Sequence, residues 1–162
     1  MALKTYRALE IARYILATAP EDGDLSNLKL QKLLYYCQGF ALVLIGRPIF
    51  DAKIKAWEHG PVVPEVWFEF KKHGQLSIPP PSQFDMDVLS VKDRNLINEV
   101  YNVYGQYSAW KLRNMTHSEP PWTQTAKDSV ISHDKLISYF KTQVTDDERD
   151  TETKKRKARK NS

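Results

Sequence analysis

Cys37 is the only cysteine among the 162 residues of this chain, so an internal disulfide is excluded. Chains without disulfides are typical of the reducing cytoplasm, and we expect a cytoplasmic protein. Long apolar runs are missing as well, since the longest, Phe40 to Ile45, is far shorter than the roughly 18 residues that cross a bilayer. The N-terminal stretch carries charges throughout and lacks the apolar centre of a signal peptide. We therefore expect no membrane partner.

A strong charge of one sign is absent from most of the chain. The net charge is +4, and residues 145–162 alone contain seven Lys or Arg and five Asp or Glu, without an aromatic residue. This composition predicts a disordered charged tail after a single folded domain at residues 1–144. The basic run Lys154–Lys160 suits weak contact with nucleic-acid phosphates, although a solubilising end is the simpler interpretation. The folded part shows no concentration of positive charge, which argues against a nucleic-acid-binding domain.

Helical periodicity is the strongest pattern that the chain does contain, and it peaks between Ser26 and Ile45. Apolar residues recur there at intervals of three and four, and others lie on the back of the same helix. A helix that is apolar on most sides is buried by several neighbours, so we expect this one at the centre of the fold. Ser26 suits the N-cap and Gly46 the turn after the last residue. The four polar residues on this helix predict one stripe facing water; they are Lys29, Gln31, Lys32 and Gln38.

Weaker patterns surround the central helix. We predict further helices at residues 3–18, 64–74, 90–105, 108–117, 122–127 and from 132 through 140, with Ser90 and Asp93 as a capping box. Pro120 and Pro121 are expected to break the chain before the helical turn at 122–127. Alternation of apolar and polar residues predicts a short strand or extended arm between Ile49 and Trp57. The expected fold class is mainly α, a single compact helical domain with a short β or extended element.

Three segments rich in Trp, His, Gly and Pro interrupt the helical patterns, at residues 57–64, 107–110 and 116–122. They are either rigid joints, in which Trp fills the core and His caps a helix, or parts of a recognition surface. Trp is a preferred anchor in protein interfaces, which makes the second interpretation worth testing. The candidate partner-binding residues are Trp57, His59, Trp67, Trp110, His117 and Trp122.

Signals for catalysis are weak. Cys37 lies on the apolar face of the central helix, where a buried thiol is usually inert. Glu58 with His59, and His117 with Glu119, could ligate a metal, but neither pair has the spacing of a known zinc motif. The sequence contains no Gly-rich phosphate loop and no GxSxG elbow. We therefore predict no catalytic residue, no metal and no cofactor.

The combination of these motifs resembles the Panacea domain, also called SocA-like or GepA-like. The resemblance runs from about Leu3 to Phe140 and depends on several segments taken together. They are Lys29–Tyr36 with Gln38 and Gly39, Gly46–Phe50, Ala56–Val66, Tyr107–Trp110 with Leu112, and Thr116–Trp122.

The resemblance implies an antitoxin of a bacterial or phage type II toxin–antitoxin system. Members of this family generally neutralise a protein toxin, encoded beside them, by direct protein–protein binding. The SocA branch implies an alternative, a proteolytic adaptor that delivers the toxin to the ClpXP protease. An enzyme that counters the toxin's modification is a further alternative. The family has no accepted catalytic residues, so the resemblance assigns none here.

Overall fold

The computed structural model of the chain describes residues 5–20 and 24–144. Helices account for most of this part, which confirms the prediction of a mainly α fold. The predicted tail at 145–162 lies outside the described residues. The elements are α1 (Ala8–Thr18), α2 (Asn27–Leu44), β1 (Lys55–Trp57), β2 (Gly60–Val62), α3 (Pro64–Phe70), α4 (Val91–Tyr104), α5 (Ala109–Thr116), α6 (Pro120–Thr123) and α7 (His133–Gln143), with 3-10 turns at Lys71–His73 and Met86–Val88.

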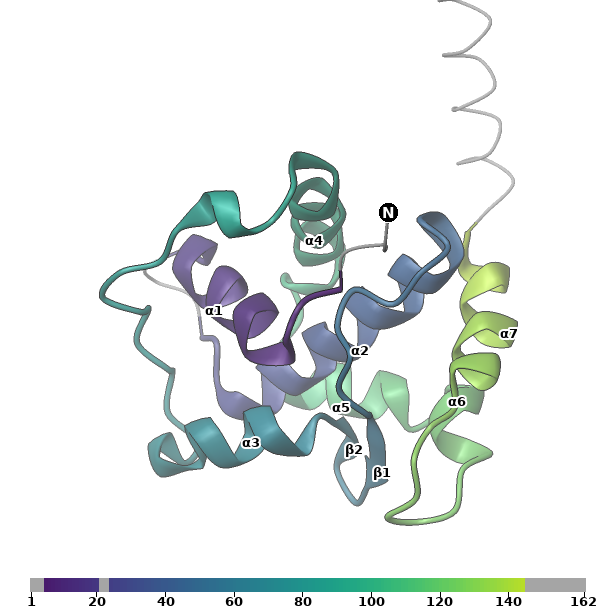
Figure 1. Cartoon of the computed structure of the whole chain (residues 1–162). Helices are drawn as coiled ribbons and strands as arrows, with labels where there is room; N and C mark the ends of the chain where they lie inside the picture. The colour runs from purple at the N-terminus through teal and green to yellow at the C-terminus, as the bar shows by residue number, and fades with distance from the viewer. Residues whose placement is uncertain (1–4, 21–23, 145–162) are drawn as a thin grey trace, which may run out of the picture.

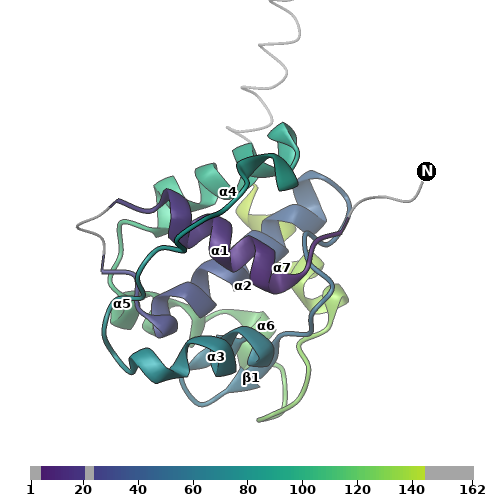
Figure 2. The same ribbon diagram turned by 60° about the vertical axis from the view of Figure 1, so that its left-hand side comes forward.

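Helix α2 is the centre of the fold, as its periodicity predicts. It contacts α1, α3, α4, α5, α7 and β2, and both views show it crossing the middle of the molecule (Figures 1 and 2). The Ser26 side chain caps the helix by accepting a hydrogen bond from the Lys29 amide. Gly46 follows its end with a φ of 72°, a conformation that glycine adopts without strain. At this end the Leu44 side chain is 48% exposed, although it belongs to the apolar pattern of the helix.

The predicted wet stripe on α2 is wrong, because all four of its polar residues are buried. Their side chains bond instead to the backbone of segments packed on the helix. The Gln38 side chain accepts hydrogen bonds from the amides of Ile49 and Phe50 and donates one to the Phe50 carbonyl. The Gln31 side chain likewise accepts from the Val63 amide at 2.9 Å. These contacts satisfy buried backbone groups that water cannot reach.

The predicted extended arm is found, but only its last three residues form a strand. Strand β1 pairs antiparallel with β2, with Trp57 opposite Gly60. Earlier in the arm, backbone groups bond to other segments: the Tyr6 amide donates to the Ile49 carbonyl, and the Ile131 amide donates to the Ile54 carbonyl. The alternation of apolar and polar residues therefore reflects which side chains are buried. Strand pairing is limited to the three residues of β1 that lie opposite β2.

Two predicted helices begin elsewhere in the structure. The helix predicted from residue 3 begins at Ala8, because Tyr6 forms a parallel bridge with Phe50. The turn predicted at 122–127 is instead α6, which begins at Pro120. Proline is tolerated at the first helical positions, where its missing N–H would have no partner, so the prolines start this helix and do not break the chain.

The capping box predicted for α4 is half formed. The Ser90 side chain accepts from the Asp93 amide, as expected. The Asp93 carboxylate, however, accepts hydrogen bonds from Arg47 at 2.8 and 2.9 Å and from the Tyr6 hydroxyl at 2.8 Å. The Ser90 amide donates to the same Tyr6 hydroxyl. Asp93 thus joins the N-terminal arm, the segment after α2 and the start of α4.

Candidate functional site

The six candidate residues gather around the β1–β2 hairpin. Three neighbouring pockets of about 300, 320 and 350 Å³ open beside it. The first two pockets share Trp57, and the first and third share His59 and Trp67. Trp122 lines the second pocket and Trp110 the third. We call the residues that line these pockets the hairpin surface; segments 50 residues apart in sequence meet on it.

His117 and Trp122 form the base of this surface. Their rings stack with centroids 4.0 Å apart and an interplanar angle of 11°. The Trp122 indole donates a 2.8 Å hydrogen bond to the Trp57 carbonyl, which fastens α6 to β1. Burial, followed by the positive charges of Arg113 and Lys32, lowers the pKa of His117, so its imidazole is neutral at pH 7. Both rings are only partly exposed, which suits a supporting role.

Trp110 and His59 line the third pocket of the hairpin surface, and both side chains face solvent. The Trp110 side chain is 57% exposed, and the Arg113 guanidinium lies 4.5 Å from the centre of its ring. The His59 and Trp110 rings are 6.2 Å apart. A cation over an exposed indole is a favourable contact that also keeps the ring in one orientation. Both side chains are exposed, so they can be reached from solvent without rearrangement of the core.

Phe68 is a member of this region that the sequence patterns missed. Its side chain is 58% exposed, and its ring lies 6.4 Å from that of Trp57, with the Lys71 amine 5.2 Å away. The helical spacing of residues in α3 could have indicated that Phe68 is exposed. Val66 and Phe70 are four residues apart and face the core, so the intervening Phe68 must lie on another face.

A buried lysine supports the hairpin from below. Lys32 is fully buried in α2, and its amine donates a 2.9 Å hydrogen bond to the Pro61 carbonyl. Burial, with a smaller contribution from Arg113, lowers the pKa of this amine to about 7. Gly60 has a φ of 107°, and a Cβ there would lie 2.8 Å from the Lys32 Cε and 2.7 Å from the Thr116 hydroxyl. Glycine is therefore required for the hairpin to rest directly on α2 and α5.

Glu119 is buried and holds parts of the fold together. Its buried carboxylate accepts hydrogen bonds from the Tyr35 hydroxyl at 2.9 Å and the Tyr36 hydroxyl at 2.8 Å. Burial raises the pKa of this carboxyl, while the tyrosine hydrogen bonds oppose that change. The Tyr36 ring also stacks on Tyr104, with centroids 3.9 Å apart. Glu119 precedes α6, so this network attaches that helix to α2.

The structure places the other candidates for chemistry as follows. Cys37 is buried, and burial raises the pKa of its thiol to about 12, which keeps it protonated. Within residues 5–20 and 24–144, no three His, Cys, Asp or Glu side chains are grouped so that they could hold a metal ion. Over the same residues, no helix has the length and apolar character needed to cross a membrane.

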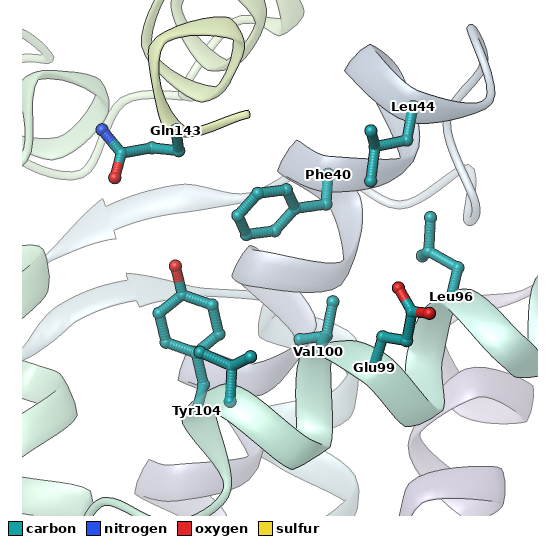
Figure 3. A pocket seen from close by; sticks show the side chains of 8 residues that line it. Phe40, Leu44, Leu96, Glu99, Val100, Tyr104 and Gln143 are labelled. Atoms are coloured by element: carbon teal, nitrogen blue, oxygen red, sulfur yellow. The ribbon is translucent and has the colours of Figure 1, made fainter. Parts of the chain in front are cut away.

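A separate apolar groove lies on the other side of α2. Phe40 and Leu44 of α2 face Leu96 and Val100 of α4 across it, and Gln143 of α7 closes one end (Figure 3). Its volume is about 270 Å³. It contains none of the six candidate residues.

Comparison with known proteins agrees with these motifs. The family described as antitoxin SocA-like, Panacea domain matches residues 30–123, more than half of the chain. Antitoxin SocA of Caulobacter vibrioides (strain NA1000 / CB15N) is 35% identical over 113 residues, which cover 62% of this chain and 60% of that protein. The chain thus spans less than two thirds of the length of this curated relative. No solved structure matches the chain. The matched residues include α2, the hairpin, α5 and α6, and the chain belongs to the SocA-like antitoxin family with the Panacea domain.

Proposed function

We propose that this protein is the antitoxin of a type II toxin–antitoxin pair and neutralises a protein toxin by binding it directly, with the hairpin surface as the interface. Family membership and the name of the Caulobacter relative support the antitoxin role. One observation supports the choice of surface: candidate residues from four separate segments, the hairpin, α3, α5 and α6, converge on it.

The chemistry of the hairpin surface suits a stable protein complex. Tryptophan and arginine are the residues that most often dominate binding energy in protein interfaces, and Trp110 carries Arg113 on its ring. Stable interfaces bury about 1,600 Å² in total and need a rigid base. His117, Trp122 and the hydrogen bond to Trp57 provide such a base beneath the exposed anchors. Little ordering is then required on binding, which favours affinity.

The test is co-expression with the protein encoded beside this one, scored for rescue of growth and for recovery of a complex. We expect one-to-one co-purification. Trp110→Ala should weaken binding at least about tenfold and leave the fold intact, because the side chain is mostly exposed. Val103→Ala is the matched control, since Val103 is 51% exposed but lines the groove of Figure 3. Equal weakening by both variants, or by Val103→Ala alone, would contradict the choice of surface.

The same experiment separates the alternatives. An adaptor for the ClpXP protease would rescue growth only when that protease is present and would shorten the toxin's half-life. An enzyme that counters the toxin's modification would act at substoichiometric amounts and leave no stable complex. Capture requires the antitoxin to match its toxin mole for mole, so rescue by trace amounts would refute the proposal.

A further inference from the structure

Basic side chains gather at the junction of α2, the hairpin and α5, and within the described part of the chain none of them forms an ion pair. We propose that this junction, centred on Arg113, binds a carboxylate from an acidic segment of the partner protein. The inference rests on the proposed function and adds the chemistry of the partner. We call the four side chains the basic cluster; they are Lys32, His59, Arg113 and His117.

Mutual repulsion shows how close these groups lie. The charge of Arg113 lowers the pKa of Lys32 and of His117, in addition to the effect of burial, and Lys32 and His59 act on His117 in the same direction. Among the residues that the structure describes, no carboxylate oxygen lies within 4.0 Å of a nitrogen in the basic cluster. Because His117 is neutral at pH 7 and the pKa of the Lys32 amine is about 7, Arg113 is the permanent positive charge of the cluster, and a cation without a counter-charge favours an incoming anion.

Two buried nitrogen atoms of the cluster make no hydrogen bond. The Nε atoms of Arg113 and His117 (Nε and Nε2) are shielded from solvent and make no hydrogen bond. Arg113 otherwise donates from one terminal nitrogen to the Asn114 side chain at 3.0 Å, at an exposed position. Its guanidinium rests on the Trp110 ring, and because Nε is shielded from solvent, the terminal nitrogen that does not bind Asn114 is the one able to donate to a carboxylate.

The surroundings indicate which kind of segment would fit. Next to Trp110 and His59 lies the 350 Å³ pocket, whose walls include Leu28 and Trp67. Such a site suits an Asp or Glu that is followed or preceded by an apolar side chain, the carboxylate reaching Arg113 and the apolar group entering the pocket. A nucleic acid would instead need positive charge along an extended path. The exposed carboxylate of Glu58 beside His59 works against a long polyanion.

The binding test uses the full-length protein and the purified product of the adjoining gene, with dissociation constants measured by calorimetry in about 50 and 300 mM NaCl. Arg113→Gln should weaken the complex about tenfold and Arg113→Glu about a hundredfold or more, and Arg113→Gln should reduce the salt dependence. Lys92→Glu, an exposed change of the same charge on α4, should change affinity less than about threefold. Thermal melts check that each variant is folded.

A charge-reversal selection identifies the partner group. From a display library of the adjoining protein, variants that bind Arg113→Glu should carry Lys or Arg in place of an Asp or Glu. Unchanged affinity of the Arg113 variants, with Trp110→Ala still weakening the complex, would overturn the carboxylate inference and leave the proposed function standing. Absence of any complex with the wild-type chain would overturn the proposed function. Competition by phosphate or RNA that depends on Arg113 would show a phosphate site and overturn the inference.

Discussion

Lys32 provides the sharpest prediction about stability. Its amine is fully buried and donates to the Pro61 carbonyl, with no carboxylate beside it among the described residues. In an unfolded chain the pKa of this amine is 10.5, and burial lowers it to about 7 in the folded state. The folded protein therefore binds this proton less tightly than the unfolded chain does. Stability must rise as the pH increases from 7 toward 10.5, because in this range the unfolded chain holds a proton on Lys32 that the folded protein lacks.

The size of the effect follows from these two pKa values. A change of one pKa unit corresponds to about 1.4 kcal/mol, so the buried charge costs roughly 5 kcal/mol at pH values below 7. Between about pH 7 and pH 8.5, Lys32 alone should raise the free energy of unfolding by about 1–2 kcal/mol. Lys32→Met removes the titrating group and retains most of the volume. We expect this variant to be at least as stable as the wild type at pH 7 and to lack that rise with pH.

Urea denaturation at a series of pH values measures both quantities. Groups that the two proteins share cancel in the comparison, including Cys37, whose raised pKa lowers stability only in alkaline solution. Lys92→Met, at an exposed position on α4, is the matched control and should change stability by less than about 0.5 kcal/mol. Parallel pH profiles for the wild type and Lys32→Met would refute the reasoning. Such a result would mean that water or an unseen counter-charge solvates the amine.

Further predictions concern packing and buried polar contacts. Tyr36→Phe should destabilise the protein by about 1–3 kcal/mol in chemical denaturation, because Glu119 loses a donor, and an unchanged midpoint would contradict that contact. Asp93→Ala should cost about 3–5 kcal/mol, since it leaves the partly buried Arg47 without its counter-charge, whereas Asp87→Ala at the exposed end of an ion pair should cost little. Gly39→Ala should cost about 1–3 kcal/mol, because a Cβ there collides with the Phe140 ring; a thermal midpoint equal to that of the wild type would show that the ring can move.

The sequence predicts those features of the fold that depend on near neighbours in the chain. The predicted helices at 26–45, 90–105, 108–117 and from 132 each begin at a serine, and each of these serines accepts a hydrogen bond from the amide three residues later. The signal and the contact lie within four residues, so composition alone suffices. The prediction for the start of α1 is wrong because the determining contact is distant in the sequence. Tyr6 is extended because it pairs with Phe50, and no local pattern encodes that pairing.

The candidate site shows the same division. Trp, His, Gly and Pro clusters identify unusual segments, and the structure brings those segments together on the hairpin surface. The sequence does not distinguish exposed Trp110 from the more enclosed Trp122, because that depends on where α6 packs. Arg113 was likewise not predicted. Arg113 enters the proposed site because its guanidinium lies over Trp110, three residues earlier on the same helix face, and because it is close to Lys32. A polarity pattern predicts that Lys32 is exposed, so it gives no sign of this second contact.

The mistaken stripe on α2 explains how the hairpin surface is held in place. Polar side chains on a helix normally face water. Here the Gln31 side chain accepts a hydrogen bond from the Val63 amide, and the Lys32 amine donates one to the Pro61 carbonyl, where the chain leaves the hairpin and enters α3. A hairpin of two three-residue strands has too little pairing to hold its own shape in water. Side chains from the most buried helix supply what the short ladder lacks. The burial of charge at Lys32 costs stability, and the surface that it helps to fix is the one we propose for binding.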